Sequence, residues 1–76
     1  MILSIEVKKT DDGFEADIPT VRGCEAWAPS EDEVLEKIIE TLRYYLKLPD
    51  DTKFKLDKTK DDFTFKKYKI GFDKLH

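Results

Sequence analysis

Residues 30–47 read SEDEVLEKIIETLRYYLK, and this stretch decides the fold that the rest of the chain has to complete. Its apolar residues recur at helical spacing and form one stripe, made of Val34, Leu35, Ile38, Ile39, Leu42, Tyr45 and Leu46. Ser30 followed three residues later by Glu33 is a capping box, which marks the start of the helix. Because one side of this helix is apolar, a sheet formed by the rest of the chain has to cover it.

Two strands joined by a hairpin are predicted near the N-terminus. Apolar and polar side chains alternate over residues 3–8, which is the period of a half-buried strand. Asp12 and Gly13 follow, and an Asp-Gly pair between two alternating runs is a strong hairpin signal. The alternation resumes over residues 14–18, and Pro19 ends it because proline cannot donate to the hydrogen-bond ladder.

One more strand is predicted before the helix and two after it. Residues 24–28 place small side chains on their inward side, which would let the helix lie close to the sheet, and Pro29 ends them. Residues 52–57 alternate again as a fourth strand. Residues 63–72 form a fifth strand whose alternation changes phase, so a β-bulge or kink is predicted at Lys66–Lys67.

These elements predict an α+β fold with the chain order β-β-β-α-β-β. The first three strands form an antiparallel meander, and the helix returns the chain so that the fourth strand runs parallel to the first. The expected strand order is 3-2-1-4-5, with a right-handed crossover and the helix on one face. The other face is expected to carry Ile2, Ser4, Glu6, Glu15, Asp17, Glu25 and Trp27.

The chain has 76 residues, and we interpret residues 1–76 as one domain. A domain of this size buries only about 60% of its extended-chain surface and often needs a disulfide, a metal or a partner subunit. Cys24 is the only cysteine and His76 the only histidine, which excludes an internal disulfide and a metal set of the common Cys/His type. We therefore expect no cofactor and a homodimer.

The chain is expected to act in the cytoplasm. Its first residues lack the basic region and cleavage site of a signal peptide, and no stretch approaches the ~18 apolar residues of a membrane span. The single unpaired cysteine is typical of a reducing compartment. We therefore expect no membrane association.

Charge is distributed unevenly along the chain. Residues 1–47 hold 6 Lys and Arg against 11 Asp and Glu, whereas residues 48–76 hold 8 against 6. The balances of −5 and +2 give the net charge of −3. The acidic first part argues against simple binding of phosphate backbones, which needs clustered cations, and is compatible with a basic protein partner.

Four features in a fixed order resemble the HicB family of antitoxin-like proteins. They are Asp12-Gly13-Phe14, then Pro19, then Gly23-Cys24, then the capping box of Ser30 and Glu33. The resemblance covers residues 1–48 as a family-like core and leaves residues 49–76 as a strand-rich C-terminal extension.

The resemblance implies a non-enzymatic protein with a reduced RNase H-like sheet that lacks the active site of that enzyme. Members of the family typically neutralise HicA, a small basic ribonuclease toxin, by covering its active surface. Many also carry a C-terminal DNA-binding module, but residues 49–76 are too few and too strand-like for one, so DNA binding through such a module is not expected. The implied protein is a short, stand-alone antitoxin-like member that acts by protein–protein occlusion.

Candidate residues for a partner or dimer interface are Ile2, Glu25, Trp27 and Tyr44. Trp27 is expected on the sheet face away from the helix, and tryptophan is enriched at binding hot spots. Alternatively, it packs across the sheet against Ile2 or a C-terminal aromatic residue. Tyr44 lies off the apolar stripe of the helix and is therefore expected to be exposed.

A different class of function is weak binding of single-stranded RNA by the C-terminal strands. The candidate contacts are Lys53, Lys55, Lys66, Lys67 and Tyr68, in a segment where lysine and aromatic residues alternate. The structural alternative is that the lysines protect an edge strand from pairing with other sheets.

Two catalytic interpretations receive less support from the sequence. Glu6, Glu15 and Asp17 share one predicted sheet face and suggest a metal-binding carboxylate cluster, but solvated outward positions of an antiparallel sheet are also polar. Cys24 lacks a nearby histidine as a base, so it is interpreted as a small buried hydrophobic residue. No catalytic or metal-binding residue is assigned.

Overall fold

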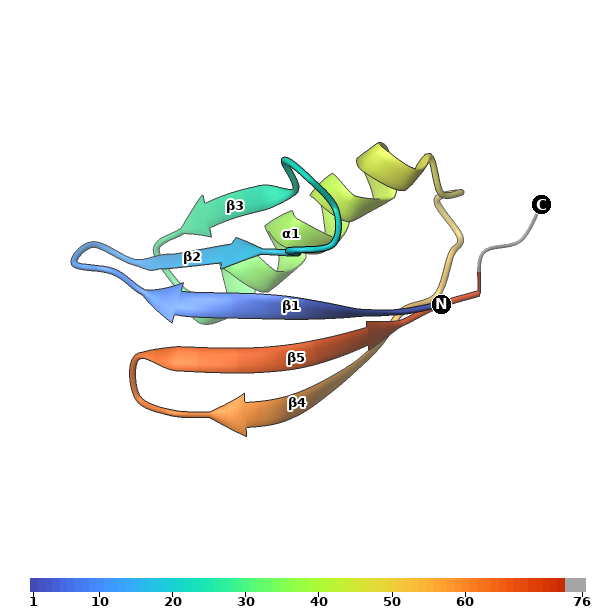
Figure 1. Cartoon of the computed structure of the whole chain (residues 1–76). Coiled ribbons are helices and arrows are strands. Elements are labelled where there is room, and N and C mark those ends of the chain that lie inside the picture. Colours follow the sequence, from blue (N-terminus) through green and yellow to red (C-terminus); the bar gives the residue numbers. More distant parts are fainter. Residues whose placement is uncertain (74–76) are drawn as a thin grey trace.

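Five strands and one helix make up the computed structural model, which describes residues 1–73 and leaves His76 outside the described residues (Figure 1). In chain order they are β1 (Ile2–Lys9), β2 (Phe14–Asp17), β3 (Glu25–Ala28), α1 (Glu31–Leu46), β4 (Lys55–Asp61) and β5 (Phe65–Gly71). The α+β class and the order β-β-β-α-β-β are therefore confirmed. The helix α1 lacks the length and hydropathy that crossing a membrane requires, and residues 1–73 contain no other helix.

The last two strands lie in the opposite order to the prediction. The sheet runs β3-β2-β1-β5-β4, which corrects the expected 3-2-1-4-5. Strand β4 runs in the same direction as β1, as expected, but β5 lies between them, so every neighbouring pair is antiparallel. The helix α1 joins β3 to β4, which run in the same direction with three strands between them. The physical reason is burial: β5 buries Tyr68 and Ile70, whereas every residue of β4 is exposed. The more apolar strand takes the inner place, and the polar strand becomes the edge.

The predicted irregularity at Lys66–Lys67 lies in the neighbouring strand instead. Strand β5 pairs with β1 in unbroken register, whereas the register between β4 and β5 shifts and leaves Thr59 as an extra residue on β4. The phase change in the sequence arises because Phe65 and Tyr68 lie on opposite faces of β5. Strand β4 also extends to Asp61, beyond the predicted end of the fourth strand, because pairing with β5 holds its polar residues.

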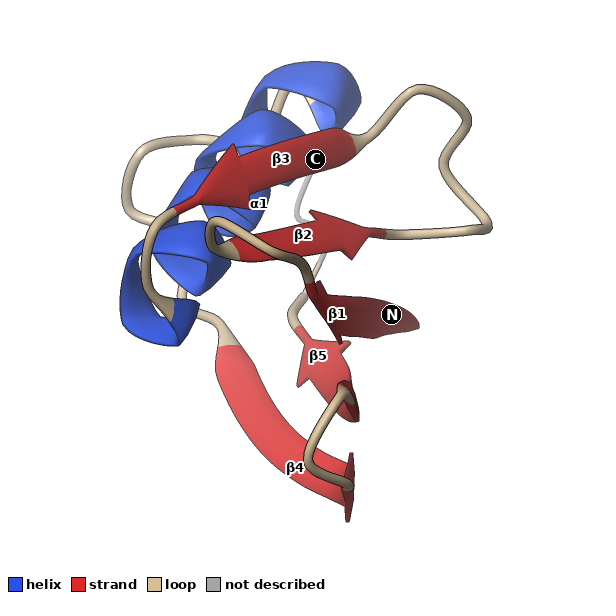
Figure 2. Ribbon diagram, turned by 90° about the vertical axis from the view of Figure 1, so that its left-hand side faces the viewer, coloured by secondary structure: helices blue, strands red, loops and turns tan. Residues whose placement is uncertain are grey.

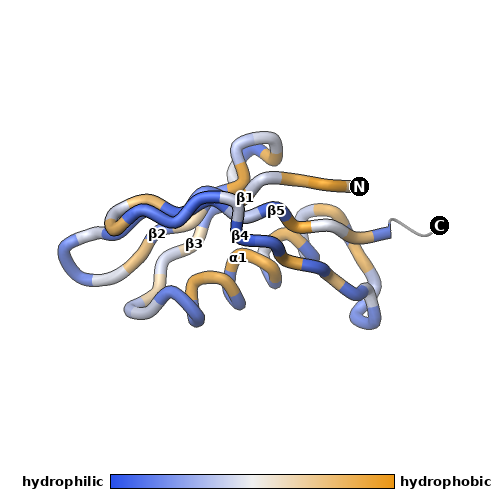
Figure 3. The backbone as a smooth tube through the Cα atoms, turned by 90° about the horizontal axis from the view of Figure 1, so that it is seen from below, coloured by the Kyte–Doolittle hydropathy of each residue, from blue (hydrophilic) through white to orange (hydrophobic). Residues whose placement is uncertain are grey.

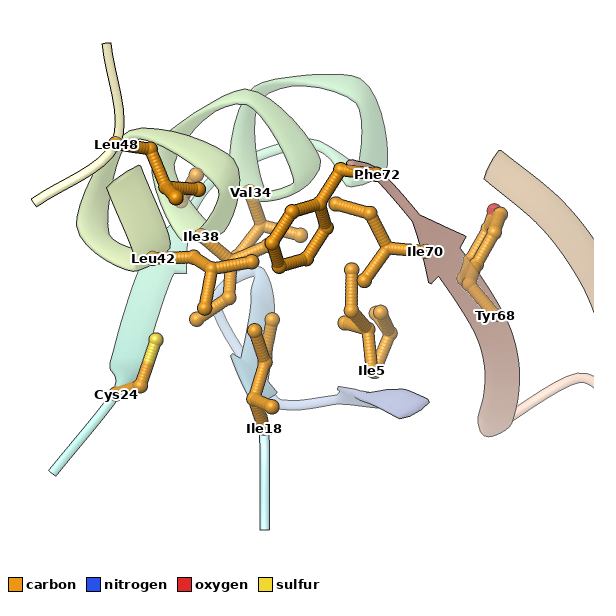
Figure 4. Close-up of a cluster of buried hydrophobic side chains, with 13 residues drawn as sticks. Ile5, Ile18, Cys24, Val34, Ile38, Leu42, Leu48, Tyr68, Ile70 and Phe72 are labelled. Atoms are coloured by element: carbon orange, nitrogen blue, oxygen red, sulfur yellow. The ribbon is translucent and has the colours of Figure 1, made fainter. Parts of the chain in front are cut away.

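The core lies between α1 and one face of the sheet. Val34, Ile38 and Leu42 of the helix are fully buried, and they meet Ile5, Ile18 and Ile70 from the strands (Figure 4). The alternation of hydrophobic and hydrophilic residues along α1 is visible in Figure 3. In Figure 2 the helix lies on one side of the strands, beside β2 and β3, with β4 below it. No helix within residues 1–73 covers the other face.

The ends of α1 follow from its sequence. The Oγ atom of Ser30 accepts a hydrogen bond from the Glu33 N–H at 3.2 Å, which confirms the predicted cap. Lys47 ends the helix in the left-handed conformation, with a φ of 54°. In the predicted stripe, Val34, Ile38 and Leu42 are buried, Tyr45 is 46% exposed, and the other three residues, Leu35, Ile39 and Leu46, are partly buried.

The hairpin at Asp12-Gly13 is confirmed, and the structure shows why glycine is needed there. The Thr10 N–H donates to the Gly13 carbonyl oxygen at 2.8 Å and closes the turn. The φ of Gly13 is not positive, so its backbone freedom is not used. A Cβ atom at Gly13 would instead lie 2.4 Å from the Ala28 oxygen and 3.0 Å from Cζ2 of Trp27. The first hairpin therefore packs directly against the end of β3.

Candidate protein-interaction surface

The sheet face opposite α1, called the outer face below, is defined by the strand registers, because directly paired residues share a face. It carries Ile2, Ser4, Glu6 and Lys8 on β1, Glu15 and Asp17 on β2, Glu25 and Trp27 on β3, Phe65, Lys67 and Lys69 on β5, and Lys55, Asp57 and Lys60 on β4. The residues of β1, β2 and β3 in this set are those that the sequence predicted, with Lys8 added.

The charges of the outer face separate by strand. The acidic half, on β2 and β3, contains Glu15, Asp17 and Glu25 and no cation. The basic half, on β4 and β5, contains Lys55, Lys60, Lys67 and Lys69, with Asp57 as its one acid. The boundary follows β1, where Glu6 pairs with Asp17 on one side and Lys67 on the other.

Carboxylates crowd one another in the acidic half. Burial raises the pKa of Asp17 above its usual value, and Glu6, Glu25 and Glu15 raise that pKa further, while Lys8 opposes them. None of the ion pairs found within residues 1–73 involves any of these four acids. The acidic half therefore presents negative charge that the described part of the chain leaves largely uncompensated.

Trp27 borders a depression in the acidic half. The depression has a volume of about 490 Å³ and is lined by Lys8, Glu15, Asp17, Glu25 and Trp27, together with Ala16 and Ala26. The Trp27 side chain is 43% exposed, and its backbone carbonyl accepts a hydrogen bond from Nζ of Lys37 at 3.3 Å. An aromatic ring beside unpaired carboxylates can bury apolar area while the acids attract a cationic partner.

Two of the four predicted interface residues lie together. Glu25 and Trp27 are neighbours on the outer face of β3. Ile2 is 71% exposed on the same face but lies at the opposite end of β1, about 20 Å along the strand from the Trp27 row, at ~3.3 Å per residue. Tyr44 is 80% exposed on α1, with its ring against Tyr45, and belongs to a different surface.

The predicted nucleic-acid contacts are divided between the two faces of the sheet. Lys67 and Lys55 lie on the outer face, and Lys53 is exposed in the connection before β4. Lys66 and Tyr68 point to the helix face. The five residues therefore do not form one platform of stacked aromatic and cationic groups.

Tyr68 and Lys66 take part in a polar network beside the N-terminus of α1. Tyr68 is 7% exposed and lies at one margin of the core (Figure 4). Its hydroxyl is hydrogen-bonded to the Glu31 carboxylate. Burial and this hydrogen bond raise the pKa of Tyr68 to about 12. Nζ of Lys66 lies 3.5 Å from Oδ1 of Asp61 and 3.9 Å from Oε1 of Glu31. These side chains join β4 and β5 to the helix, which is a structural role.

The geometry does not support a metal-binding carboxylate cluster or a nucleophilic Cys24. Glu6, Glu15 and Asp17 do lie on one face, but no group of His, Cys, Asp and Glu within residues 1–73 is arranged to hold a metal ion. Cys24 is 1% exposed in the core, and burial, with a smaller contribution from Asp17, raises the pKa of its thiol. A raised pKa disfavours the reactive thiolate, so Cys24 is a core residue, as its sequence position indicates.

Comparison of the chain with protein-family models, with curated protein sequences and with solved structures finds no significant match. The resemblance to the HicB family therefore stays a prediction. The function has to be argued from the surface itself.

Part of this surface was outside the reach of sequence reasoning. The sequence alone does not place Lys60, Lys69 and Phe65 on one face, because their common face depends on the pairing of β1 with β5 and on the shift at Thr59. The one available signal was the change of charge balance between residues 1–47 and 48–76. The strand order converts that change along the chain into a division across one face.

Proposed function

We propose that this protein is a non-enzymatic binding domain that acts through the acidic half of its outer face. In line with the HicB resemblance, its partner is a small basic ribonuclease toxin of HicA type, which it neutralises by covering the toxin's active surface. The observation that carries the proposal is the set of carboxylates around Trp27 that has no ion pair within residues 1–73.

Physical chemistry supports a basic partner over a neutral one. Uncompensated carboxylates lower the potential over the acidic half, which speeds the encounter with a cationic surface. Binding also relieves the crowding that raises the pKa of Asp17, because partner cations stabilise its ionised form. Trp27 supplies apolar area next to these charges, in the arrangement typical of an interaction hot spot.

The proposal also states where the protein acts and that it does not bind DNA directly. We place the action in the cytoplasm, where the target mRNA of such a toxin lies and where the unpaired Cys24 stays reduced. Direct DNA binding is not part of the proposal, because residues 55–71 form a hairpin of the sheet and not a helical DNA-binding module.

The test is binding to, and inhibition of, a basic ribonuclease encoded beside this protein. The purified chain is expected to bind the toxin and protect RNA from cleavage, and Glu15→Lys with Glu25→Lys is expected to weaken binding at least tenfold, since like charges across an interface cost several kcal/mol. The matched control is Asp50→Lys with Asp51→Lys, which makes the same charge change at exposed positions in the connection between α1 and β4 and should bind normally. No binding by the wild-type chain, or equal loss in both variants, would refute the proposal.

Weak binding of single-stranded RNA is a second proposal, supported by the basic half of the outer face. Lys67 and Lys69 have no ion pair within residues 1–73, and Phe65 lies beside them on the same strand face. A fluorescence titration with an oligonucleotide at low salt tests it. Binding should weaken as salt rises, and absence of salt-dependent binding rules it out.

A further inference from the structure

The outer face carries its two signs of charge in separate halves, on either side of β1. A surface of this kind is complementary to itself after half a turn about an axis along the boundary. We propose that a second copy of this chain covers the outer face, with the acidic half of each copy on the basic half of the other.

The charge pattern selects the symmetry axis. An axis that lies in the interface and runs parallel to β1 places β2 and β3 of one copy over β5 and β4 of its partner. Glu15, Asp17 and Glu25 then face lysine-bearing strands in two equivalent contacts, as a closed two-fold dimer requires. An in-plane axis perpendicular to the strands would instead put acid on acid and lysine on lysine.

The outer face reaches the size of a standard dimer interface only when most of it is covered. The molecule measures 40 by 20 by 20 Å, so a face that contains the long axis has a flat area of at most about 800 Å², and a standard interface buries ~800 Å² per partner. Two twisted antiparallel sheets can pack face to face with their strands about 30° apart. The helix lies on the opposite side of the sheet and does not obstruct this approach (Figure 2).

Unpaired charges on both halves explain why the occupant is a second copy. Lys67 and Lys69 have no ion pair within residues 1–73, and the same holds for Glu15 and Glu25. Partner lysines over the acidic half would supply the cations that the crowded carboxylates around Asp17 lack. Because an interface of charged groups has to be desolvated, the dimer is expected to be weak and to dissociate as salt rises.

The inference goes beyond the proposed function and does not rest on it. A dimer would form with no toxin present, and because it covers the acidic half, it would compete with the toxin for that surface. The experiment therefore uses the full chain alone, so that its failure says nothing about the toxin.

The test is sedimentation equilibrium at low salt with two charge-reversed variants. Glu15→Lys with Glu25→Lys reverses two of the three carboxylates of the acidic half, and Lys67→Glu with Lys69→Glu reverses two of the four lysines of the basic half. Each variant alone is expected to raise the dimer dissociation constant at least tenfold, because like charges then face each other. An equimolar mixture of the two is expected to regain the dimer mass, since the reversed acids of one variant then face the reversed lysines of the other.

Two controls keep the result decisive. Asp50→Lys with Asp51→Lys, in the connection after α1, should leave the dimer unchanged, and far-ultraviolet circular dichroism should show that each variant is folded. A monomeric wild-type mass up to high concentration at low salt would overturn the inference. So would two folded variants whose mixture stays monomeric, or a variant with lysine at positions 50 and 51 that dissociates as strongly as the outer-face variants.

Discussion

Replacing Gly13 by alanine tests the contact that joins the first hairpin to β3. The added Cβ would lie 2.4 Å from the Ala28 carbonyl oxygen, whereas real Cβ contacts essentially never fall below 3.0 Å. The two segments must therefore separate by more than half an ångström, although Ala28 is fully buried. Such overpacking typically costs about 1–3 kcal/mol. For a domain of this size, 1 kcal/mol corresponds to a fall in Tm of about 4–8 °C.

Urea unfolding followed by tryptophan fluorescence measures this cost, because Trp27 is the only tryptophan and its Cζ2 lies 3.0 Å from the site of the new Cβ. Gly71→Ala is the matched control: its Cβ would meet nothing closer than Cγ1 of Ile2 at 3.9 Å. This control is expected within about 0.5 kcal/mol of wild type, or slightly stabilised by the reduced entropy of its unfolded chain. If Gly13→Ala unfolds like Gly71→Ala, the close approach described here is not what requires glycine.

Three further predictions concern the helix cap and two titrating groups. Ser30→Ala removes the acceptor of the Glu33 N–H and should cost about 1 kcal/mol in urea unfolding; an unchanged midpoint would contradict the cap. In the folded chain the pKa of Tyr68 is raised from 10.0 to about 12, so its contribution to the free energy of unfolding is complete below pH 10. Between pH 10 and 12 the free energy of unfolding should fall by about 2–3 kcal/mol, because the unfolded chain loses the tyrosine proton first. Urea unfolding of Tyr68→Phe over the same pH range should not show this fall. The pKa of Asp17 is also raised in the folded chain, so ionisation of its carboxyl group opposes folding at pH values above 3.8, its ordinary pKa. Asp17→Asn should therefore have a higher Tm than wild type at neutral pH and the same Tm below pH 3.8. A lower Tm of this variant at neutral pH would refute the prediction.

The helix and the first three strands could be predicted because local signals and burial agree there. Ser30 caps α1 as its spacing with Glu33 indicates, and Val34, Ile38 and Leu42 are buried as their period requires. The alternation in β1 assigns its two faces correctly, since Ile5 and Val7 lie in the core. In these segments the local sequence pattern alone is sufficient to predict the element and the face on which each residue lies.

The C-terminal strands could not be placed in the same way, because their positions depend on competition between segments. Strand β4 has no buried residue of its own, and it is held by pairing with β5 and by side chains such as Lys58, whose Nζ lies 3.6 Å from Oε2 of Glu31. Which of two strands lies beside β1 depends on which one buries more apolar area there, and Ile70 decides that in favour of β5. A periodic pattern identifies strands, but it does not rank them for the central place.

Binding of a basic toxin and self-association both use the acidic half of the outer face, but only self-association also needs the basic half. Lysine-to-glutamate changes at Lys67 and Lys69 remove the groups on which a second copy would place its carboxylates, but they leave Glu15, Asp17 and Glu25 intact. Such a variant should therefore lose self-association and still bind a basic protein, more tightly than wild type, because lysines that repel that partner are gone and no second copy competes. The opposite reversal, at Glu15 and Glu25, should weaken both interactions at least tenfold. A surface divided by charge thus lets one part of the face be tested without altering the other.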